Sequence, residues 1–265
     1  MGCARVSQER EAAEFLSKTW YANTRVPSIP QPCRPKDRAE GYRVAAELSG
    51  VRAAPVAGWK IAATSEAGQR HINVEGPLIG RIYADRLLPP GAIVPFVDNV
   101  MKVAEGEFAF RLARDMPPRE AEYTRDEVMA ATASLHLSLE VPDSRYEDFT
   151  KVGAAQLIAD TACACWLVLG PPVEAEWRGV SLADHRLSGW VNGKKVNDGS
   201  GKAALGDPWT ALTWAVNEAS RYCGGLSAGD FVTTGTCIVP LAVAAGDEIG
   251  IDYGDFGSIS ARIAG

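Results

Sequence analysis

The sequence predicts an α+β fold in which a helical N-terminal lobe precedes a mixed, β-rich domain. Three observations lead to this fold class. The first fifty residues carry apolar side chains at helical spacing, short strand-like runs bounded by Gly, Pro and Asn begin at Val56, and the chain after Asp230 is almost entirely strand-like. Because strands and helices do not alternate regularly, we expect a largely antiparallel or mixed sheet rather than a parallel one.

Two helices are expected in the N-terminal lobe, residues 1–55. Ser7 is a suitable N-cap for the first helix. The apolar stripe of that helix comprises Ala12, Phe15, Leu16 and Thr19. After a proline-rich connector over 26–35, Asp37 is a suitable N-cap for a second helix, which we expect to reach about Leu48 and to end at Gly50.

The second predicted domain, residues 56–265, consists of short strands with helices between them. Strands are expected at 56–61, 80–83, 93–96, 105–112, 135–141, 230–234, 247–253 and 258–263, and helices at about 65–71, 124–134, 150–164 and 207–223. Asn192-Gly193 predicts a hairpin over 190–196, because both residue types adopt the positive φ angles of a type I′ turn. A glycine-rich stretch over 254–257 predicts another hairpin turn.

The composition is that of an ordinary globular protein and excludes several classes. Of the 265 residues 46% are apolar, and 27 Lys and Arg against 33 Asp and Glu give a net charge of −6. Nothing here favours nucleic acid or an anionic membrane as a partner. The apolar runs are far shorter than the roughly 20 residues of a membrane span, and Glu9, Arg10, Glu11 and Glu14 interrupt any signal-peptide core. The six cysteines are scattered, so we expect reduced thiols and a cytoplasmic protein.

The sharpest chemical pattern is a set of carboxylates on two alternating runs. Over 104–112, Glu105 and Glu107 share one face of a strand, and over 135–141, Glu140 lies on the polar face. If the two strands are neighbours, three anions converge and require a cation or shared protons. An all-oxygen set of ligands suits Mg²⁺ or Mn²⁺. The alternative is that the three glutamates are ordinary solvent-facing residues of half-buried strands.

Lys60 is unusual because it lies within the apolar, strand-like run 56–62. A buried lysine needs a partner. In a pocket it would bind a substrate carboxylate or, with a lowered pKa, carry a proton. The alternative is a position at a sheet edge from which the ammonium reaches water.

Other motifs do not support competing chemistry. The stretch 198–202 lacks the residues that a phosphate-binding loop needs at either side. Cys163 and Cys165 are too close together for a zinc knuckle, and no second pair exists. With only three histidines, a Ser-His-Asp triad or a histidine-rich metal site is poorly supported.

Six motifs occur in an order that resembles a known family. They are Gly58-Trp59-Lys60-Ile61, Ala104 to Phe110, Leu139 to Arg145, Ala159-Asp160-Thr161-Ala162, Leu205-Gly206-Asp207-Pro208 and Ala228 to Gly235. In this order the chain resembles the 2-oxopent-4-enoate (2-hydroxypentadienoate) hydratases and the 4-oxalocrotonate decarboxylases, which belong to the wider fumarylacetoacetate hydrolase fold. The resemblance covers roughly residues 10–263. It implies a mixed, rolled β-sheet core with the helical lobe in front, and a catalytic domain over 56–265.

The resemblance also implies roles for individual residues. The family's Glu-x-Glu pair and its later glutamate fall on Glu105, Glu107 and Glu140, which would hold Mg²⁺ or Mn²⁺. The family's active-site lysine falls on Lys60. A further Asp-Ser-Arg motif falls on 143–145, where Asp143 and Arg145 would support the site rather than bind the metal.

The chain departs from the family pattern at two places. Leu78 stands where many hydratases carry an aspartate, and the family's Ala-Asp-Asn-Ala-Ser appears here as a run that ends in Cys163. Because an acid that could handle protons is lost, a decarboxylase becomes more attractive. The expected candidate substrate contacts are Leu78, Cys163, Thr234, Gly235 and Thr236.

The function that the resemblance implies is a divalent-metal-dependent lyase of aromatic catabolism. It would add water to an unsaturated 2-oxo acid of the 2-hydroxypenta-2,4-dienoate type through a metal-stabilised enolate. The enzymatic alternatives are a decarboxylase of a vinylogous 2-oxo diacid such as 4-oxalocrotonate, and an acylpyruvate C–C hydrolase. The non-enzymatic alternative is a degenerate partner subunit. The resemblance also implies a homo-oligomer that can associate with a pathway partner enzyme.

Overall fold

The N-terminal lobe consists of two helices that begin where the sequence predicts. In the computed structural model, which describes residues 7–265, α1 spans Gln8–Ala22 and α2 spans Arg38–Val51, with the short 3₁₀ helix η1 (Gln31–Cys33) between them. The Ser7 and Asp37 side chains accept hydrogen bonds from backbone N–H groups of the first turns, as expected of N-caps. The prediction that Gly50 ends α2 is wrong. Gly50 keeps a helical conformation, and the Arg52 N–H donates to the Leu48 carbonyl at 3.1 Å, closing the last turn after Val51.

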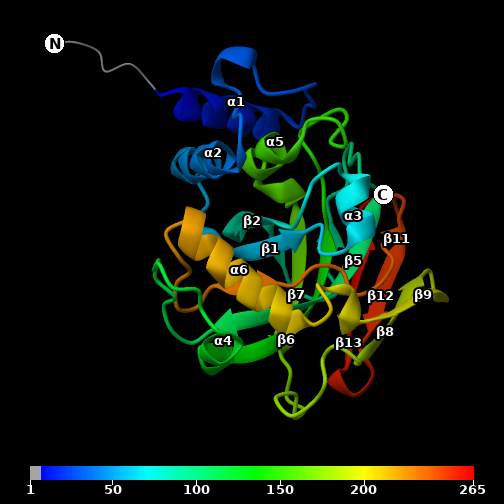
Figure 1. Ribbon diagram of the computed structural model, residues 1–265. Helices are drawn as coiled ribbons and strands as arrows, with labels where there is room; N and C mark the ends of the chain where they lie inside the picture. Colours follow the sequence, from blue (N-terminus) through cyan, green and yellow to red (C-terminus); the bar gives the residue numbers. More distant parts are fainter. Residues whose placement is uncertain (1–6) are drawn as a thin grey trace.

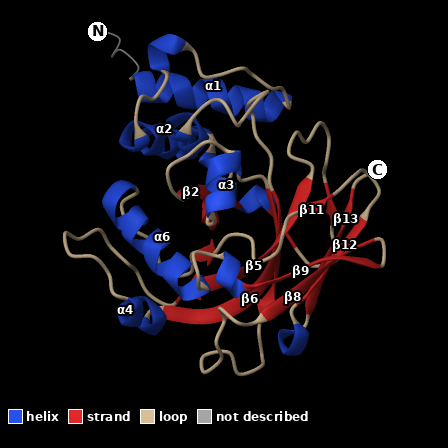
Figure 2. Cartoon of the chain, turned by 45° about the vertical axis from the view of Figure 1, so that its right-hand side comes forward, coloured by secondary structure: helices blue, strands red, loops and turns tan. Residues whose placement is uncertain are grey.

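Eight strands form the larger sheet, which curls around the centre of the molecule (Figures 1 and 2). Its order is β2 (Leu78–Tyr83), β1 (Val56–Ala62), β10 (Phe231–Thr233), β5 (Val103–Leu112), β6 (Thr132–Val141), β7 (Trp166–Pro172) and β3 (Leu87–Leu88), with β11 (Leu241–Ala242) also paired to β5. The β1–β10 and β3–β7 pairs are parallel and the others antiparallel. The expected mixed, rolled sheet is therefore confirmed.

A second sheet of five strands packs beside the first and is built mostly from the C-terminal part of the chain. Its order is β4 (Ile93–Val94), β13 (Ser258–Ile263), β12 (Glu248–Asp252), β8 (Arg186–Val191) and β9 (Lys194–Ser200). The predicted hairpin joins β8 to β9, and Asn192 and Gly193 both have positive φ, at 52° and 72°. The predicted turn over 254–257 contains the 3₁₀ helix η5 (Gly254–Phe256) and joins β12 to β13.

The remaining helices cover the sheets and are mostly short. They are α3 (Glu66–His71), α4 (Arg125–Ala130), α5 (Ala154–Ala159) and α6 (Pro208–Tyr222), with 3₁₀ helices at Ala84–Arg86 (η2), Thr161–Cys163 (η3) and Gly201–Ala203 (η4). The long helix α6 lies across one face of the larger sheet (Figure 2), where Trp209 stacks on Phe110 of β5 with ring centroids 4.3 Å apart. This stack anchors α6 to the strand that carries Glu105 and Glu107.

Three segments differ from the sequence expectation. The helix expected over 150–164 is reduced to α5 over 154–159, and a turn with positive φ angles follows at 161–163. The helix expected over 124–134 stops at Ala130, and β6 begins at Thr132, because the alternating pattern of β6 extends further toward the N-terminus than predicted. Strand β7 was not expected. Its residues 166–169 are apolar on both faces of the strand, so it lacks the alternation that identifies a half-buried strand.

The N-terminal helices and the sheets share one hydrophobic cluster. Leu16 and Leu48 of the helices belong to the same set of packed, buried side chains as Phe108 and Phe110 of the sheet. The division at residue 55 into a lobe and a catalytic domain therefore stays a prediction about folding units. Between residues 7 and 265, the structure contains no helix that is both long and apolar enough to cross a membrane.

Candidate metal centre

The pairing of β5 with β6 brings the three predicted carboxylates together. The two strands are antiparallel, and Glu105 lies directly opposite Glu140. Glu107 is two residues further along β5 and therefore faces the same side. One carboxylate oxygen from each residue lies within 4.8 Å of the others. Glu107 and Glu140 are 0% and 1% exposed and Glu105 is partly buried, so the alternative of ordinary surface glutamates is wrong.

The oxygens of this cluster have few partners within the described chain. Glu107 Oε2 accepts a hydrogen bond of 2.9 Å from the Gly235 N–H, but Glu107 Oε1 and both oxygens of Glu140 accept none. Burial raises the pKa of all three carboxyls, and the neighbouring Glu140 adds to this for Glu105, whose pKa is raised to about 7. Buried oxygens that accept no hydrogen bond are costly in free energy. A hard divalent cation prefers oxygen ligands, so these carboxylate oxygens fit such a cation.

Lys60 faces the carboxylates from the middle of β1. Its side chain is 3% exposed, and its Nζ lies 3.2 Å from Glu140 Oε1 and donates a hydrogen bond of 3.1 Å to the Ala162 carbonyl. Burial alone would lower the pKa of Lys60, but Glu140, Glu105 and Glu107 outweigh burial and raise it. Lys60 is therefore an ammonium, and the alternative in which it reaches water at a sheet edge is wrong. Three carboxylates against one ammonium still leave an excess of negative charge.

The Ala162 carbonyl is presented to Lys60 by an unusual turn. Thr161, Ala162 and Cys163 all have positive φ, at 56°, 52° and 62°, a conformation that non-glycine residues avoid. Gly80 of β2 lies against this turn, and a Cβ at Gly80 would stand 1.8 Å from the Thr161 carbonyl oxygen. The absence of a side chain at position 80 therefore allows the strained turn to approach β2.

A buried ionic network holds the turn from the other side. Asp160 pairs with the Arg145 guanidinium, which also donates to the Asp160 and Ala164 carbonyls at 2.8 and 3.2 Å. The Trp20 indole N–H of α1 donates to Asp160 Oδ1 at 3.2 Å, and the Arg145 guanidinium stacks 3.8 Å from the Trp20 ring centroid. Asp160, Trp20 and Gly80 were not assigned roles from the sequence, although Asp160 lies in one of the quoted motifs.

Asp143 lies beside the same turn and not within the carboxylate cluster. Its N–H donates to the Cys163 carbonyl at 3.1 Å, Oδ1 accepts from the Val100 N–H at 2.8 Å, and Oδ2 pairs with Arg25 at 2.5 Å. Asp143 and Arg145 thus both contact the segment that presents a carbonyl to Lys60.

A cavity of about 410 Å³ opens onto Lys60 and Glu105. Of the expected substrate contacts, Cys163 and Thr236 line this cavity, and Gly235 bonds to Glu107 instead. Burial raises the pKa of the Cys163 thiol to about 12, so it stays protonated.

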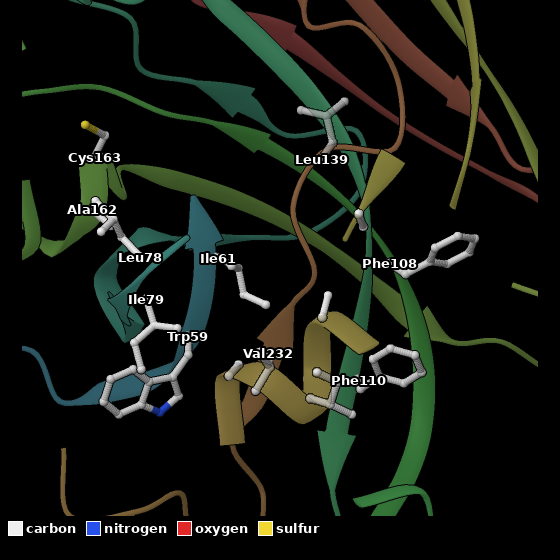
Figure 3. Close-up of a cluster of buried hydrophobic side chains, with 14 of the residues drawn as sticks. Trp59, Ile61, Leu78, Ile79, Phe108, Phe110, Leu139, Ala162, Cys163 and Val232 are labelled. Carbon is white, nitrogen blue, oxygen red and sulfur yellow. The ribbon is translucent and has the colours of Figure 1, made fainter. Parts of the chain in front are cut away.

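Two of the expected substrate contacts lie elsewhere. Leu78 is fully buried in the hydrophobic core, among the apolar side chains drawn in Figure 3, and the Thr234 hydroxyl donates to the Phe108 carbonyl. Neither residue lines the cavity. His71 does line the cavity and is exposed. From the sequence it was considered only as one of three histidines too few for a metal site or a triad.

Together the curled sheet and its site define a class of protein: an α+β fold with a carboxylate cluster that fits a divalent cation beside a lysine. The family model described as fumarylacetoacetate (FAA) hydrolase C-terminal matches residues 81–264. The chain belongs to this family, whose named relatives include hydratases and decarboxylases.

Three similar proteins illustrate the relationship. The chain is 32% identical to 2-keto-4-pentenoate hydratase 1 of Dechloromonas aromatica, over 78% of this chain and 77% of the relative. It is 30% identical to the 4-oxalocrotonate decarboxylase of Pseudomonas sp. strain CF600, over 84% of each chain. The solved 4-oxalocrotonate decarboxylase from Pseudomonas putida G7, complexed with magnesium and adipate, superposes with a TM-score of 0.86 at 25% identity, covering 98% of this chain and 99% of that one. A second structure of that enzyme is complexed with calcium and acetate.

Proposed function

We propose that this chain is a divalent-metal-dependent lyase that acts on an unsaturated 2-oxo acid. The observation that carries the proposal is the cluster of Glu105, Glu107 and Glu140 beside Lys60, at a cavity large enough for a small organic acid. The three glutamates would hold Mg²⁺ or Mn²⁺. When bound, the cation would supply a Lewis acid that stabilises negative charge on the oxygens of a 2-oxo acid.

The described residues suit the remaining steps. The Lys60 ammonium, fixed between Glu140 and the Ala162 carbonyl, would bind the substrate carboxylate or exchange a proton with the substrate. In the hydratase reaction, the 2-hydroxydiene first becomes the conjugated 2-oxo-3-ene by proton transfer. Water then adds its hydroxyl to C4 and a proton to C3. Most side chains of the cavity wall are apolar.

Hydration is the leading activity, and decarboxylation is the second candidate. The decarboxylase is favoured by the structural likeness to a 4-oxalocrotonate decarboxylase and by the fully buried Leu78 where many hydratases carry an acid. In that reaction CO₂ leaves and the resulting enolate takes up a proton, so no water needs to be activated. Acylpyruvate hydrolysis remains a third alternative without a specific observation in its favour.

The two leading activities are separated by their products. With Mg²⁺ present, a hydratase should consume 2-hydroxypenta-2,4-dienoate with loss of its ultraviolet absorbance and without release of CO₂. Consumption of 4-oxalocrotonate alone, with evolution of CO₂, would establish the decarboxylase instead. If neither compound nor an acylpyruvate is consumed, the partner-subunit alternative is favoured.

Glu107→Gln tests the proposed metal site directly. Replacing one anionic ligand should weaken Mg²⁺ or Mn²⁺ binding at least tenfold and reduce turnover in parallel, because Glu107 has an oxygen with no partner within the described chain. Isothermal titration with the metal alone measures the affinity. Glu66→Gln, a change at a side chain that is 87% exposed, is the matched control. Unchanged metal affinity in Glu107→Gln would remove this residue from the ligand set.

Assembly and location also belong to the proposal. We expect a homo-oligomer, with or without a pathway partner enzyme, and light scattering on the purified protein tests the first part. A cytoplasmic location stays an expectation from the sequence.

A further inference from the structure

We infer that the cavity beyond Lys60 is a subsite for an uncharged, apolar substrate tail that is longer than a vinyl group. The inference rests on the proposed function, because it takes the 2-oxo acid end of the substrate to lie at the glutamates and Lys60. The site should therefore prefer a monocarboxylic 2-oxo acid with an alkyl tail to a dicarboxylic acid.

The chemistry of the cavity wall carries the inference. Away from Lys60 and Glu105, most lining side chains are apolar, and several are small. The larger apolar side chains of the wall are Ile61, Ile72, Met101, Ile238, Val239 and Pro240. Such a surface gains free energy when it excludes water from a hydrocarbon tail.

The cations at the wall are too few for a second carboxylate. Among the described residues that line the cavity, Lys60 is the only lysine or arginine. Its Nζ already contacts Glu140 Oε1 and the Ala162 carbonyl. His71 lies at the opening, exposed, with its ring edge-on to Phe149 at 5.8 Å. A distal carboxylate within the cavity would thus lose water without gaining a paired cation.

Of the remaining polar groups at the wall, two hydroxyls already form hydrogen bonds within the protein. The Thr236 hydroxyl donates to the Ile238 carbonyl at 2.8 Å, and the Ser65 hydroxyl accepts from the Gly68 N–H at 3.1 Å. The Cys163 thiol is a weak donor. These groups are poor substitutes for a guanidinium, which would bind a carboxylate through two parallel hydrogen bonds.

The size of the cavity determines the length of the tail. At about 410 Å³, it falls within the range of about 300–1,000 Å³ that holds drug-sized ligands. A five-carbon acid leaves much of this space unfilled. The tail should therefore extend by further methylene groups along the apolar wall.

A binding series of saturated 2-oxo acids tests the inference without requiring turnover. Isothermal titration in Mg²⁺ would use 2-oxopentanoate, 2-oxohexanoate, 2-oxoheptanoate and the diacid 2-oxoadipate. The Kd should fall about fourfold for each added methylene, from about 0.8 kcal/mol per buried CH₂. The diacid should bind at least tenfold more weakly than 2-oxohexanoate. Equal Kd values along the series, or a diacid that binds as tightly as 2-oxohexanoate, would overturn the inference.

A pair of lysine variants sharpens the test. Val239 lines the cavity and is 66% exposed, so Val239→Lys can place an ammonium at the wall without disturbing the core. It should raise the affinity for 2-oxoadipate relative to 2-oxohexanoate by about threefold, the scale of an exposed ion pair. Val97→Lys adds the same charge at a residue that is 70% exposed and does not line the cavity, and should leave the ratio unchanged. An unchanged ratio in Val239→Lys would count against the inference.

The outcomes separate this inference from the proposed function. If the acids bind in the expected order but no unsaturated 2-oxo acid is turned over, the proposed lyase fails and the subsite stands. If turnover is found but the diacid is preferred, the lyase stands and the apolar subsite is wrong. A diacid preference that His71→Ala removes would assign the distal carboxylate to His71. If no 2-oxo acid binds, both fail.

Discussion

At the scale of single residues, the proposed chemistry depends on three clustered carboxylates that repel one another and on one ammonium that does not neutralise them. The sequence alternation correctly placed Glu105 and Glu107 on one face of a strand and Glu140 on a polar face of another. It could not show that Glu105 lies opposite Glu140, because register is decided by tertiary pairing. It also could not show the burial that separates a binding site from a solvated strand face.

The raised pKa of Glu105 predicts a pH dependence for the metal-free protein. Its pKa is about 7 in the folded state against an ordinary value of 4.5. Between these values the folded chain holds a proton that the unfolded chain has released, so this group's stabilising contribution is present below 4.5 and is lost as the pH rises to about 7. The Glu105→Gln side chain resembles the protonated form of Glu105, so this variant should lose less stability as the pH rises.

Thermal melts in a chelator, at intervals between these pH values, measure the effect. The wild-type Tm should decline with rising pH more steeply than that of Glu105→Gln, and added Mg²⁺ should flatten the decline of the wild type because the cation replaces the proton. Glu66→Gln, at an exposed side chain, should follow the wild type. Parallel curves for the wild type and Glu105→Gln would show that the carboxyl of Glu105 titrates normally.

At the scale of elements, the site depends on a strained turn that local sequence rules would not place. Three successive non-glycine residues over 161–163 adopt positive φ, which local preference disfavours and only the surrounding structure can enforce. By contrast, the N-caps, the Asn-Gly hairpin and the alternating strands follow from short-range rules, and these were predicted correctly. What was missed, strand β7 and the turn, depends on contacts between segments distant in the sequence.

Gly80→Ala tests the packing of this turn against β2. A Cβ at position 80 would stand 1.8 Å from the Thr161 carbonyl oxygen, so the turn must move and the Ala162 carbonyl would shift relative to Lys60. We expect a loss of about 3 kcal/mol or more in the free energy of unfolding, or roughly 6 °C or more in Tm, together with a lower kcat. Thermal melts and steady-state kinetics measure both quantities.

Gly76→Ala is the matched control for this change. No atom lies within 4 Å of a Cβ built at Gly76, and its φ is not positive. Stability and turnover should therefore stay close to the wild type. If Gly80→Ala behaves in the same way as Gly76→Ala, the turn is not held against β2 as described.

At the scale of the whole molecule, the N-terminal helices and the catalytic sheet are coupled. They share a hydrophobic cluster, and Tyr42 of α2 donates a hydrogen bond of 2.9 Å to Glu218 of α6. The most direct connection to the site is Trp20 of α1, which bonds to Asp160 across 140 residues of sequence. Asp160 in turn precedes the turn that contacts Lys60. This path predicts that a change in the N-terminal helices alters the position of Lys60, the proposed catalytic residue, although Trp20 does not line the cavity.

Trp20→Phe tests that coupling, since it removes the indole N–H and keeps an aromatic ring beneath the Arg145 guanidinium. Loss of a hydrogen bond to a charged group costs about 1.5–3 kcal/mol, so the Tm should fall by several degrees. If Trp20 has a purely structural role, Trp20→Phe should lower the Tm and leave kcat unchanged. A positioning role should also lower kcat severalfold at a temperature where the variant is fully folded, while the affinity for Mg²⁺ alone stays unchanged because the three glutamates are not moved. Trp190→Phe removes the indole hydrogen bond to Ser188 at 3.2 Å on the second sheet and should leave kcat as it is. If Trp20→Phe loses stability but keeps the wild-type kcat, the helices support the fold without positioning Lys60.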